Sequence, residues 1–205
     1  MNKEEEFDVI AREVFFPLYA VIAKDSVKVL NRKNGKCLDI GCGGGFFGLH
    51  VAKITEMDIL FCDYSENAIA ICDKRREEWG LNNRTASLVC DVHRLDIPSN
   101  LFDLIVSRSS IGFWGDVEEV KKAFSELYRV LAPGGVTYIG RGFGNEEIYN
   151  EIVEKMKIYN PAWPGSLKSI TNNLTTKDYK KILNELEIKF EMVEDESGNW
   201  IIMKK

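Results

Sequence analysis

The chain has 205 residues, which is enough for one domain with a sizeable hydrophobic core. Apolar residues make up 45% of it and charged residues 29%, as in ordinary soluble globular proteins. Its net charge of -5 gives no electrostatic reason to bind nucleic acid, and no apolar run reaches the ~20 residues that span a bilayer, so we expect neither a nucleic-acid nor a membrane partner.

The acidic N-terminal residues lack the basic and apolar regions of a signal peptide, which predicts a cytoplasmic protein. The five cysteines contain no C-x-x-C pair, and the only histidines are His50 and His93. We therefore expect free thiols in a reducing compartment and no metal site.

Two helices are predicted before the first strand, within residues 4–31. Apolar residues recur at helical spacing from Phe7 to Val14, and Pro17 is expected to kink or end the first helix. We interpret residues 1–33 as a helical lid over the edge of the domain, from which Tyr19 can reach a ligand. Packing of the aromatic side chains between the helices explains the same residues.

Residues 37–48 read C-L-D-I-G-C-G-G-G-F-F-G, an apolar strand that turns on glycines into a helix. Such a turn lets a ligand approach the main chain and presents the free N–H groups of a helix N-terminus. Residues 43–48 fit the dinucleotide fingerprint G-x-G-x-x-G, and residues 39–45 fit D-x-G-x-G-x-G. Asp39 favours the second pattern, because its carboxylate would repel a pyrophosphate and attract an ammonium group.

Strand and helix signals alternate through the rest of the chain. Strands are predicted over residues 57–62, 86–90, 102–107 and 136–140, helices over 66–79, 117–131, 145–158 and 176–187, and a closing antiparallel hairpin over 188–193 and 199–203. This order predicts a single α/β domain with a Rossmann-like, doubly wound parallel sheet and helices on both faces. Within it we expect a ligand-binding core over residues 34–141 and substrate-side helices with the hairpin over residues 142–205. Residues 160–173 show little periodicity and are expected to contribute to substrate choice.

Three consecutive predicted strands are followed by aspartate, at Asp39, Asp63 and Asp91. Because ligands of such sheets bind beyond the carboxyl ends of the strands, we expect these carboxylates at one site. Asp63 can accept hydrogen bonds from both hydroxyls of a ribose. Asp91 can accept from an exocyclic amino group beside the N–H of Val92, and Tyr64 can flank the base. Any one of these carboxylates alone is explained as well by helix capping.

The chain resembles the class I S-adenosylmethionine (SAM)-dependent methyltransferases, of the compact small-molecule type related to quinone-biosynthesis methyltransferases. The resemblance runs from about residue 34 to 136. Five segments carry it in order: L-D-I-G-C-G-G-G at 38–45, D-Y-S at 63–65, C-D-V at 90–92, F-D-L-I-V-S at 102–107 and L-Y-R-V-L-A-P-G-G at 127–135. It implies a seven-stranded sheet in the order 3-2-1-4-5-7-6, with strand 7 antiparallel.

The resemblance also implies SAM as the cofactor and a small-molecule acceptor. The methionine part would be held by Asp39, Gly41 and Gly43, with Ser107 facing it. Asp63 would hold the ribose, and Asp91 with Val92 would hold the adenine. The set of cofactor-binding residues expected from the sequence is therefore Asp39, Gly41, Gly43, Asp63, Tyr64, Asp91, Val92 and Ser107.

Methyl transfer from a sulfonium is an in-line displacement that depends mainly on alignment, with a base required only if the nucleophile must lose a proton. No catalytic residue is predicted, and both histidines are explained by packing or surface positions. Ser107-Arg108-Ser109-Ser110 lacks the N-P-P-Tyr type of sequence used for exocyclic amino groups of adenine, which argues against DNA methylation. Methylation at oxygen, nitrogen, carbon or sulfur of a small molecule stays open.

Two arginines, Arg108 and Arg141, follow neighbouring strands on the expected ligand edge, where they can bind an anionic group of the substrate. Ion pairing with Asp116 or Glu146 is the alternative. Substrate contacts are also predicted for Tyr19, Trp114 and Trp163, and the tryptophans are equally explained by packing.

Three classes of function are compatible with the sequence. The leading one is an enzyme, a SAM-dependent methyltransferase. The second is an NAD(P)-dependent oxidoreductase, which is weakened by Asp39 and by the lack of a Tyr-x-x-x-Lys pair. The third is a non-catalytic SAM-binding module on the same scaffold. The sequence predicts no particular oligomeric state and no particular acceptor.

Overall fold

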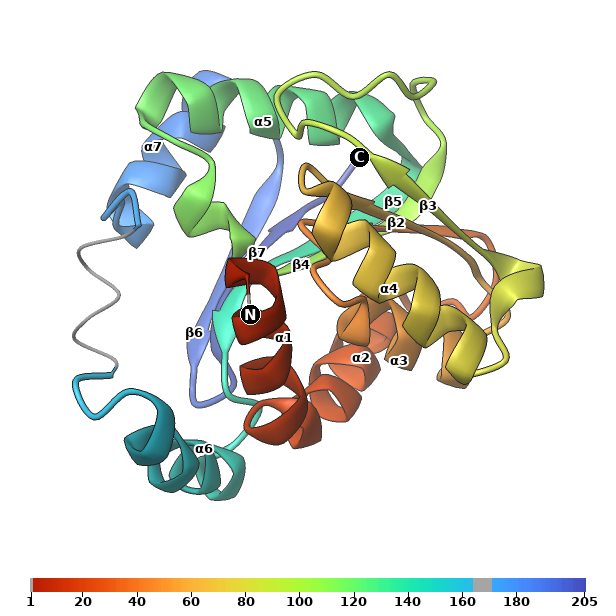
Figure 1. The fold of residues 1–205 in the computed structure, drawn as a ribbon. Helices are drawn as coiled ribbons and strands as arrows, with labels where there is room; N and C mark the ends of the chain where they lie inside the picture. Colours follow the sequence, from red (N-terminus) through yellow and green to blue (C-terminus); the bar gives the residue numbers. More distant parts are fainter. Residues whose placement is uncertain (1, 164–170) are drawn as a thin grey trace.

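The computed structural model describes residues 2–163 and 171–205, and it is built around a seven-stranded sheet (Figure 1). The strands lie in the order β3-β2-β1-β4-β5-β7-β6, and β7 runs antiparallel to both of its neighbours. Both features were predicted. The strands are β1 (Lys36–Ile40), β2 (Asp58–Asp63), β3 (Thr85–Val89), β4 (Phe102–Arg108), β5 (Leu131–Gly142), β6 (Phe190–Asp195) and β7 (Gly198–Met203).

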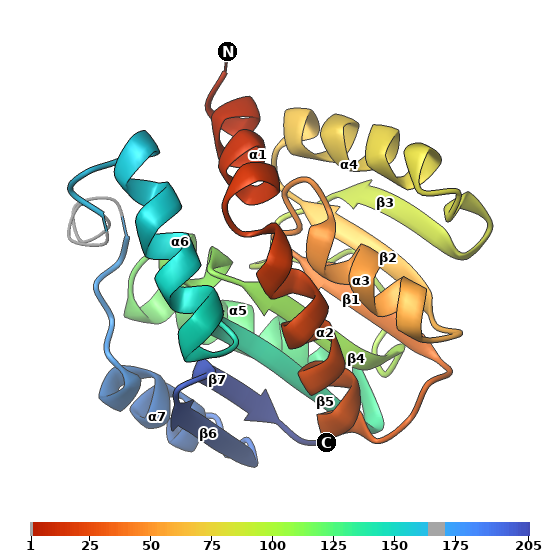
Figure 2. The same ribbon diagram turned by 90° about the horizontal axis from the view of Figure 1, so that it is seen from below.

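Helices cover both faces of the sheet, as expected for parallel strands joined by crossovers (Figure 2). One face carries α2, α3 and α4, and the other carries α5 and α7. The helices are α1 (Lys3–Glu13), α2 (Phe16–Leu30), α3 (Phe46–Ile54), α4 (Glu66–Glu78), α5 (Val117–Val130), α6 (Glu146–Tyr159) and α7 (Thr176–Glu185). Two short 3₁₀ helices, η1 (Asn82–Arg84) and η2 (Ser110–Phe113), complete the described elements.

Most boundaries differ from the prediction by one or two residues, and two larger differences have a clear physical cause. Pro17 does not end the first helix but lies in the first turn of α2, where a missing N–H costs nothing. Residues 133–135, expected to separate α5 from the fifth strand, belong to β5, which begins at Leu131. The register with β4 shifts between Phe102 and Leu104, so the Pro-Gly-Gly segment is accommodated as an irregularity within the strand.

Side-chain alternation along the central strands divides the core into two layers. In β4, Leu104 and Val106 pack with α2 and α3, whereas Ile105 packs with α5. All three are fully buried. This alternation decides on which face of the sheet each site residue projects.

All five cysteines are free thiols, as the sequence predicts for a reducing compartment, and Cys37, Cys62 and Cys72 are buried. Among residues 2–163 and 171–205, we find no helix that combines the length and apolar character needed to cross a bilayer. Residues 164–170, half of the segment expected to contribute to substrate choice, lie outside the described residues.

Candidate functional site

Asp39 lies in β1, separated from the glycine turn by Ile40, and is only 2% exposed. Its Oδ2 accepts a hydrogen bond of 2.8 Å from the N–H of Gly48, in the first turn of α3. The carboxylate therefore supplies the cap that the helix lacks, because its N-cap residue Gly45 has no side chain. Burial raises the pKa of Asp39 to about 7; the Gly48 hydrogen bond opposes the rise and the charge of Asp63 adds to it.

The glycine turn needs glycine for two different reasons. Gly41 has φ of 65°, and a Cβ there would lie 2.4 Å from the Cβ of Ser110. Gly43 has φ of 52°, but a Cβ there would meet nothing within 4 Å. The first glycine thus permits close packing of the turn against η2, and the second faces open space beside the strand ends.

Asp63 ends β2 and is tied to the same turn. Its Oδ2 accepts from the N–H of Gly43 at 2.9 Å, and its Oδ1 accepts from the N–H of Ser65 at 3.1 Å. A carboxylate oxygen can accept two hydrogen bonds, so each oxygen keeps capacity for a further donor. The neighbouring Tyr64 is 78% exposed, so its ring is accessible to a ligand.

Asp91 follows β3 after one intervening residue. Its Oδ1 accepts from both the backbone N–H and Nδ1 of His93, at 2.9 and 2.6 Å, and the backbone bond is the main reason why the pKa of Asp91 is lowered. The second ring nitrogen of His93 lies 2.9 Å from the carbonyl oxygen of Trp114. The N–H of Val92 has no hydrogen-bond partner among the described residues. An acceptor and a donor without a partner among the described residues therefore lie side by side.

Ser107, at the end of β4, is 1% exposed. Its hydroxyl donates to the carbonyl oxygen of Ile40 at 2.7 Å, which ties β4 to the end of β1. The side chain is thus engaged by the fold, and a role toward a ligand is left to its main chain.

The next residue, Arg108, projects onto the face that carries α2. Its guanidinium lies 4.2 Å from the ring centroid of Phe15 and 5.8 Å from that of Tyr19. Burial lowers the pKa of Arg108, and the Tyr19 hydroxyl acts in the opposite direction. The buried Nε has no hydrogen-bond partner, and no salt bridge to Arg108 exists among the described residues. The expected alternative, an ion pair with Asp116, is therefore absent from the described chain.

Arg108 and Arg141 project to opposite faces of the sheet. Arg108 is paired in register with Gly140, so the next residue, Arg141, projects to the opposite face of the sheet. Burial raises the pKa of Tyr179 in α7, and the charge of Arg141 opposes this rise, as expected if Arg141 lies on the face that carries α7. It also lines a surface depression of about 520 Å³ whose carboxylates, Glu146 among them, disfavour an anion. The expectation that both arginines bind one anionic group is wrong because of strand alternation.

The two tryptophans that were predicted to contact the substrate also lie on opposite faces of the sheet. Trp163 packs edge-on against Phe15, with ring centroids 6.4 Å apart, and so lies beside the aromatic cover of Arg108. Trp114 is 5% exposed and packs against Phe124 of α5 on the other face. The structure brings Tyr19, Arg108 and Trp163 together and places Trp114 in the core.

A buried ion pair at the site was not predicted. Arg75 of α4 donates to both carboxylate oxygens of Asp8 in α1, at 2.9 and 2.8 Å, and to the carbonyl oxygen of Gly44. Its guanidinium lies 3.9 Å from the ring centroid of Phe46. The N-terminal helix is thereby fastened to the glycine turn. The partners are 67 residues apart, on helices whose faces look ordinary in sequence, so no local signal indicates the pair.

His50, which received no role from the sequence, lies among aromatic rings. Its ring centroid is 5.4 Å from that of Phe16 and 5.2 Å from that of Trp79. Burial lowers its pKa. Packing accounts for this histidine.

The sequence and the fold are similar to those of known proteins. The family profile described as "Methyltransferase domain" matches residues 37–135. A solved structure from Methanococcus maripaludis, described as a candidate S-adenosyl-L-methionine-dependent methyltransferase, is 35% identical with a TM-score of 0.90, and the match covers 98% of this chain and 91% of that chain.

Curated relatives match over a shorter range. The mitochondrial arginine-hydroxylase NDUFAF5 of Rattus norvegicus is 34% identical over 125 residues, which are 61% of this chain and 34% of that protein. The sterol 24-C-methyltransferase erg6 of Aspergillus fumigatus is 27% identical over 133 residues, 65% of this chain and 32% of that protein. The chain thus matches about a third of the length of these two relatives, whose named reactions differ.

Proposed function

Because the chain belongs to the class I SAM-dependent methyltransferases, whose cofactor is S-adenosyl-L-methionine, we propose that it methylates a small-molecule acceptor that carries an anionic group. SAM supplies an electrophilic methyl group on a sulfonium. The protein contributes binding, alignment and an electrostatic environment. The observation that carries the acceptor part of the proposal is the half-buried guanidinium of Arg108, whose buried Nε has no hydrogen-bond partner and which has no carboxylate partner among the described residues.

The residues at the strand ends fit the cofactor. A buried carboxylate at Asp39 suits the ammonium group of the methionine moiety, and the open space beside Gly43 leaves room for it. Asp63 has acceptor capacity left for the two ribose hydroxyls. Asp91 and the free N–H of Val92 match the donor and acceptor that adenine presents.

The surroundings of Arg108 favour an anionic acceptor. A partly buried cation without a charged partner is costly, and the aromatic faces of Phe15 and Tyr19 compensate only part of that cost. Residues 164–170 contain no aspartate or glutamate, so an acidic side chain from that segment cannot supply the missing charge. Arg108 directly follows Ser107, whose hydroxyl reaches the end of β1 beside Asp39, which supports a position for Arg108 near the methionine end of the proposed cofactor site.

Thermal unfolding with added ligand tests the cofactor assignment. A ligand that binds the native state alone stabilises it, so S-adenosylhomocysteine at about a hundred times its Kd should add about 2.7 kcal/mol to the free energy of unfolding. NAD at the same concentration should give no shift. Stabilisation by NAD and none by S-adenosylhomocysteine would remove the proposal.

Replacement of Arg108 by glutamine should impair turnover of anionic acceptors selectively. With labelled SAM and a panel of carboxylic acids paired with their primary amides, the wild-type protein should methylate the acids. In Arg108→Gln, KM for an active acid should rise about tenfold or more, as expected for loss of a hydrogen bond to a charged group.

The affinity for S-adenosylhomocysteine serves as the check on folding and should change less than about twofold. Arg141→Gln removes the same charge on the other face of the sheet and is the matched control. Equal loss in both variants, or equal turnover of acids and amides by the wild type, would contradict an anion-binding role for Arg108.

A further inference from the structure

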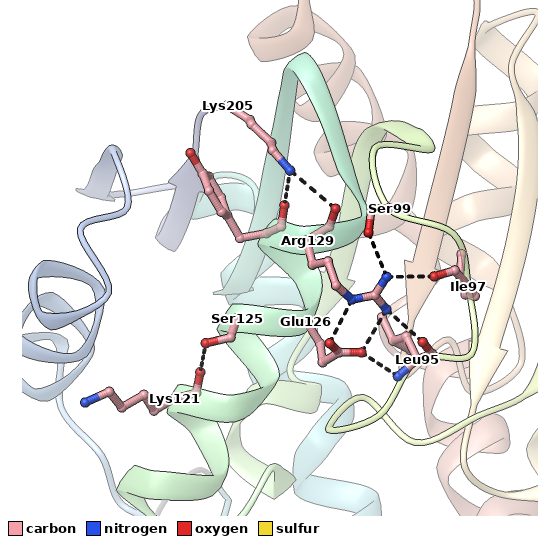
Figure 3. A network of polar contacts seen from close by, with 9 residues as sticks. Leu95, Ile97, Ser99, Lys121, Ser125, Glu126, Arg129 and Lys205 are labelled. Carbon is pink, nitrogen blue, oxygen red and sulfur yellow. Dashed lines mark hydrogen bonds and ion pairs between the residues drawn. The ribbon is translucent and has the colours of Figure 1, made fainter.

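The segment L-Y-R-V-L-A-P-G-G, which includes the end of α5, carries an arginine whose every N–H is used (Figure 3). Arg129 donates from Nε and Nη2 to the two carboxylate oxygens of Glu126, both at 2.9 Å. Nη2 also donates to the carbonyl oxygen of Leu95 at 2.8 Å. Nη1 donates to the carbonyl oxygen of Ile97 at 2.8 Å and to Ser99 Oγ at 3.2 Å. A guanidinium has five N–H donors, so none is left for a ligand.

Glu126 binds the same stretch of main chain as Arg129. Its Oε2 accepts from the N–H of Leu95 at 2.8 Å, so both backbone polar groups of Leu95 are bound by the pair. The hydrogen bond with Arg129 lowers the pKa of Glu126, and the same bond raises the pKa of Arg129, so the pair is charged at neutral pH. The side chains of Leu95 and Ile97 are 4% and 8% exposed and pack in the core beneath α5.

The segment held in this way is the one that begins with the adenine-directed groups. Asp91 and Val92 lie four and three residues before Leu95. Residues 91–94 form a turn that is closed by the hydrogen bond from the Arg94 N–H to the Asp91 carbonyl oxygen at 3.0 Å. Its other attachment runs through His93, from Asp91 to the carbonyl oxygen of Trp114. The Asp91 side chain itself is 64% exposed, so its direction depends on this turn and on the two hydrogen bonds from His93.

We propose that Arg129 and Glu126 are positioning residues that hold residues 91–97 in the conformation that recognises the adenine ring, and that they thereby set the affinity and base selectivity of the cofactor site. The proposal rests on the proposed function. Neither side chain contacts the ligand. They raise the fraction of molecules in which Asp91 and Val92 already have the binding conformation. When the segment is released this fraction falls, and the apparent affinity for the ligand falls in proportion.

Lys205 provides a matched control on the same helix end. Its Nζ donates to the carbonyl oxygens of Tyr128 and Arg129, at 2.8 and 3.3 Å, and bonds to no residue of the 91–101 segment. Loss of this lysine removes a capping interaction from α5 but leaves the Arg129–Glu126 pair in place. A purely structural contribution of the helix end would be shared by Lys205, whereas positioning of the segment would not.

The experiment compares S-adenosylhomocysteine with S-inosylhomocysteine, in which an oxygen replaces the amino group of the base. Wild-type protein should prefer the first, because the oxygen cannot donate to Asp91 and is repelled by it. In Arg129→Gln, the Kd for S-adenosylhomocysteine should rise about tenfold while that for S-inosylhomocysteine changes about twofold or less, so the preference narrows about fivefold. Glu126→Gln should shift the preference in the same direction.

Hydrogen exchange gives the second readout. The amides of residues 92–99 should exchange about tenfold faster in Arg129→Gln, and those of the α5 helix much less. Lys205→Met should lower the melting temperature but leave both the base preference and the exchange of this segment unchanged. Arg129→Lys keeps the charge and loses the planar fork, and it serves in place of Arg129→Gln if that variant does not fold.

The outcomes separate the inference from the proposed function. Failure of wild-type protein to bind S-adenosylhomocysteine would overturn the proposed function. Binding with a clear preference for adenine that persists within about twofold in the Arg129 and Glu126 variants would overturn the inference alone. An equal loss of preference in Lys205→Met would also overturn it, since the effect would then belong to the helix end.

Discussion

Asp39→Asn is expected to weaken binding of S-adenosylhomocysteine by about a hundredfold, which corresponds to ~2.7 kcal/mol and lies within the range for hydrogen bonds to charged groups. The carboxylate is 2% exposed, so its attraction for an ammonium group is little screened by water. The amide oxygen of asparagine can still accept from the N–H of Gly48, so α3 keeps its cap and the fold should survive.

Isothermal calorimetry measures this loss, and Asp103→Asn is the matched control. Asp103 also lies in a central strand, but it accepts from the N–H of Lys36 at the opposite end of β1 and pairs with Arg32. That variant should bind S-adenosylhomocysteine as the wild type does. Retention of wild-type affinity in Asp39→Asn would show that the buried carboxylate serves only as a helix cap.

The raised pKa of Asp39 predicts a pH dependence with a definite sign. A bound ammonium group favours the ionised carboxylate, whereas in the ligand-free protein this carboxyl takes up a proton below pH of about 7. Affinity for S-adenosylhomocysteine should therefore fall, by up to about tenfold per pH unit, as the pH decreases below this value. Titration by calorimetry between pH 8 and about 5 checks this, and the slope should disappear in Asp39→Asn.

The same group affects stability in the opposite direction. Its pKa in the folded protein lies above the ordinary value of 3.8, so folding favours the protonated form. The stabilising contribution is complete below the unfolded pKa and is lost as the pH rises through about 7. The ligand-free protein should thus gain stability from Asp39 in the range in which ligand affinity declines, which is the behaviour expected of a charge held in place for a ligand rather than for the fold.

The sequence was sufficient to predict the sheet and the line of carboxylates because both depend on local signals. Apolar runs, glycine and proline positions and aspartates at strand ends are each visible within about ten residues, and parallel topology brings the strand ends together. The strand order was predicted from the resemblance, not from the residues alone. The expectation that Arg108 and Arg141 lie together failed because of an offset of one residue. Arg108 is in register with Gly140, and side chains of adjacent strand residues, such as Gly140 and Arg141, project to opposite faces of the sheet.

Contacts between distant segments were not predictable in this way. Arg129 lies in a segment that was identified as part of the resemblance, yet its acceptors at residues 95–99 are main-chain carbonyls and a serine, which have no distinctive sequence pattern. Tyr19 was expected near the ligand but not over Arg108, because its position depends on how α2 crosses the strand ends. Such features follow from the packing of complete elements, and only the assembled fold displays them.

Arg75→Met is expected to lower the free energy of unfolding by about 3 kcal/mol, since it leaves the Asp8 carboxylate buried without its partner. Both side chains are about nine-tenths buried, and Asp8 is the one buried residue of α1. Asp8→Asn should cost less, because Arg75 keeps its bond to the Gly44 carbonyl oxygen and its place on Phe46. Urea unfolding measures both losses.

The double variant decides whether the pair acts as a unit. If the ion pair accounts for the losses, Asp8→Leu combined with Arg75→Met should be less destabilised than the sum of the single Asp8→Leu and Arg75→Met changes by about 2 kcal/mol, because neither charge is then left buried alone. Strictly additive losses would mean that each residue contributes by packing. Because α1 has so little other buried surface, the single variants should also become susceptible to limited proteolysis within residues 3–13, before the rest of the chain unfolds. Release of α1 in this way would expose the glycine turn, so the ion pair that stabilises the N-terminal helix would also control how open the cofactor site is to solvent.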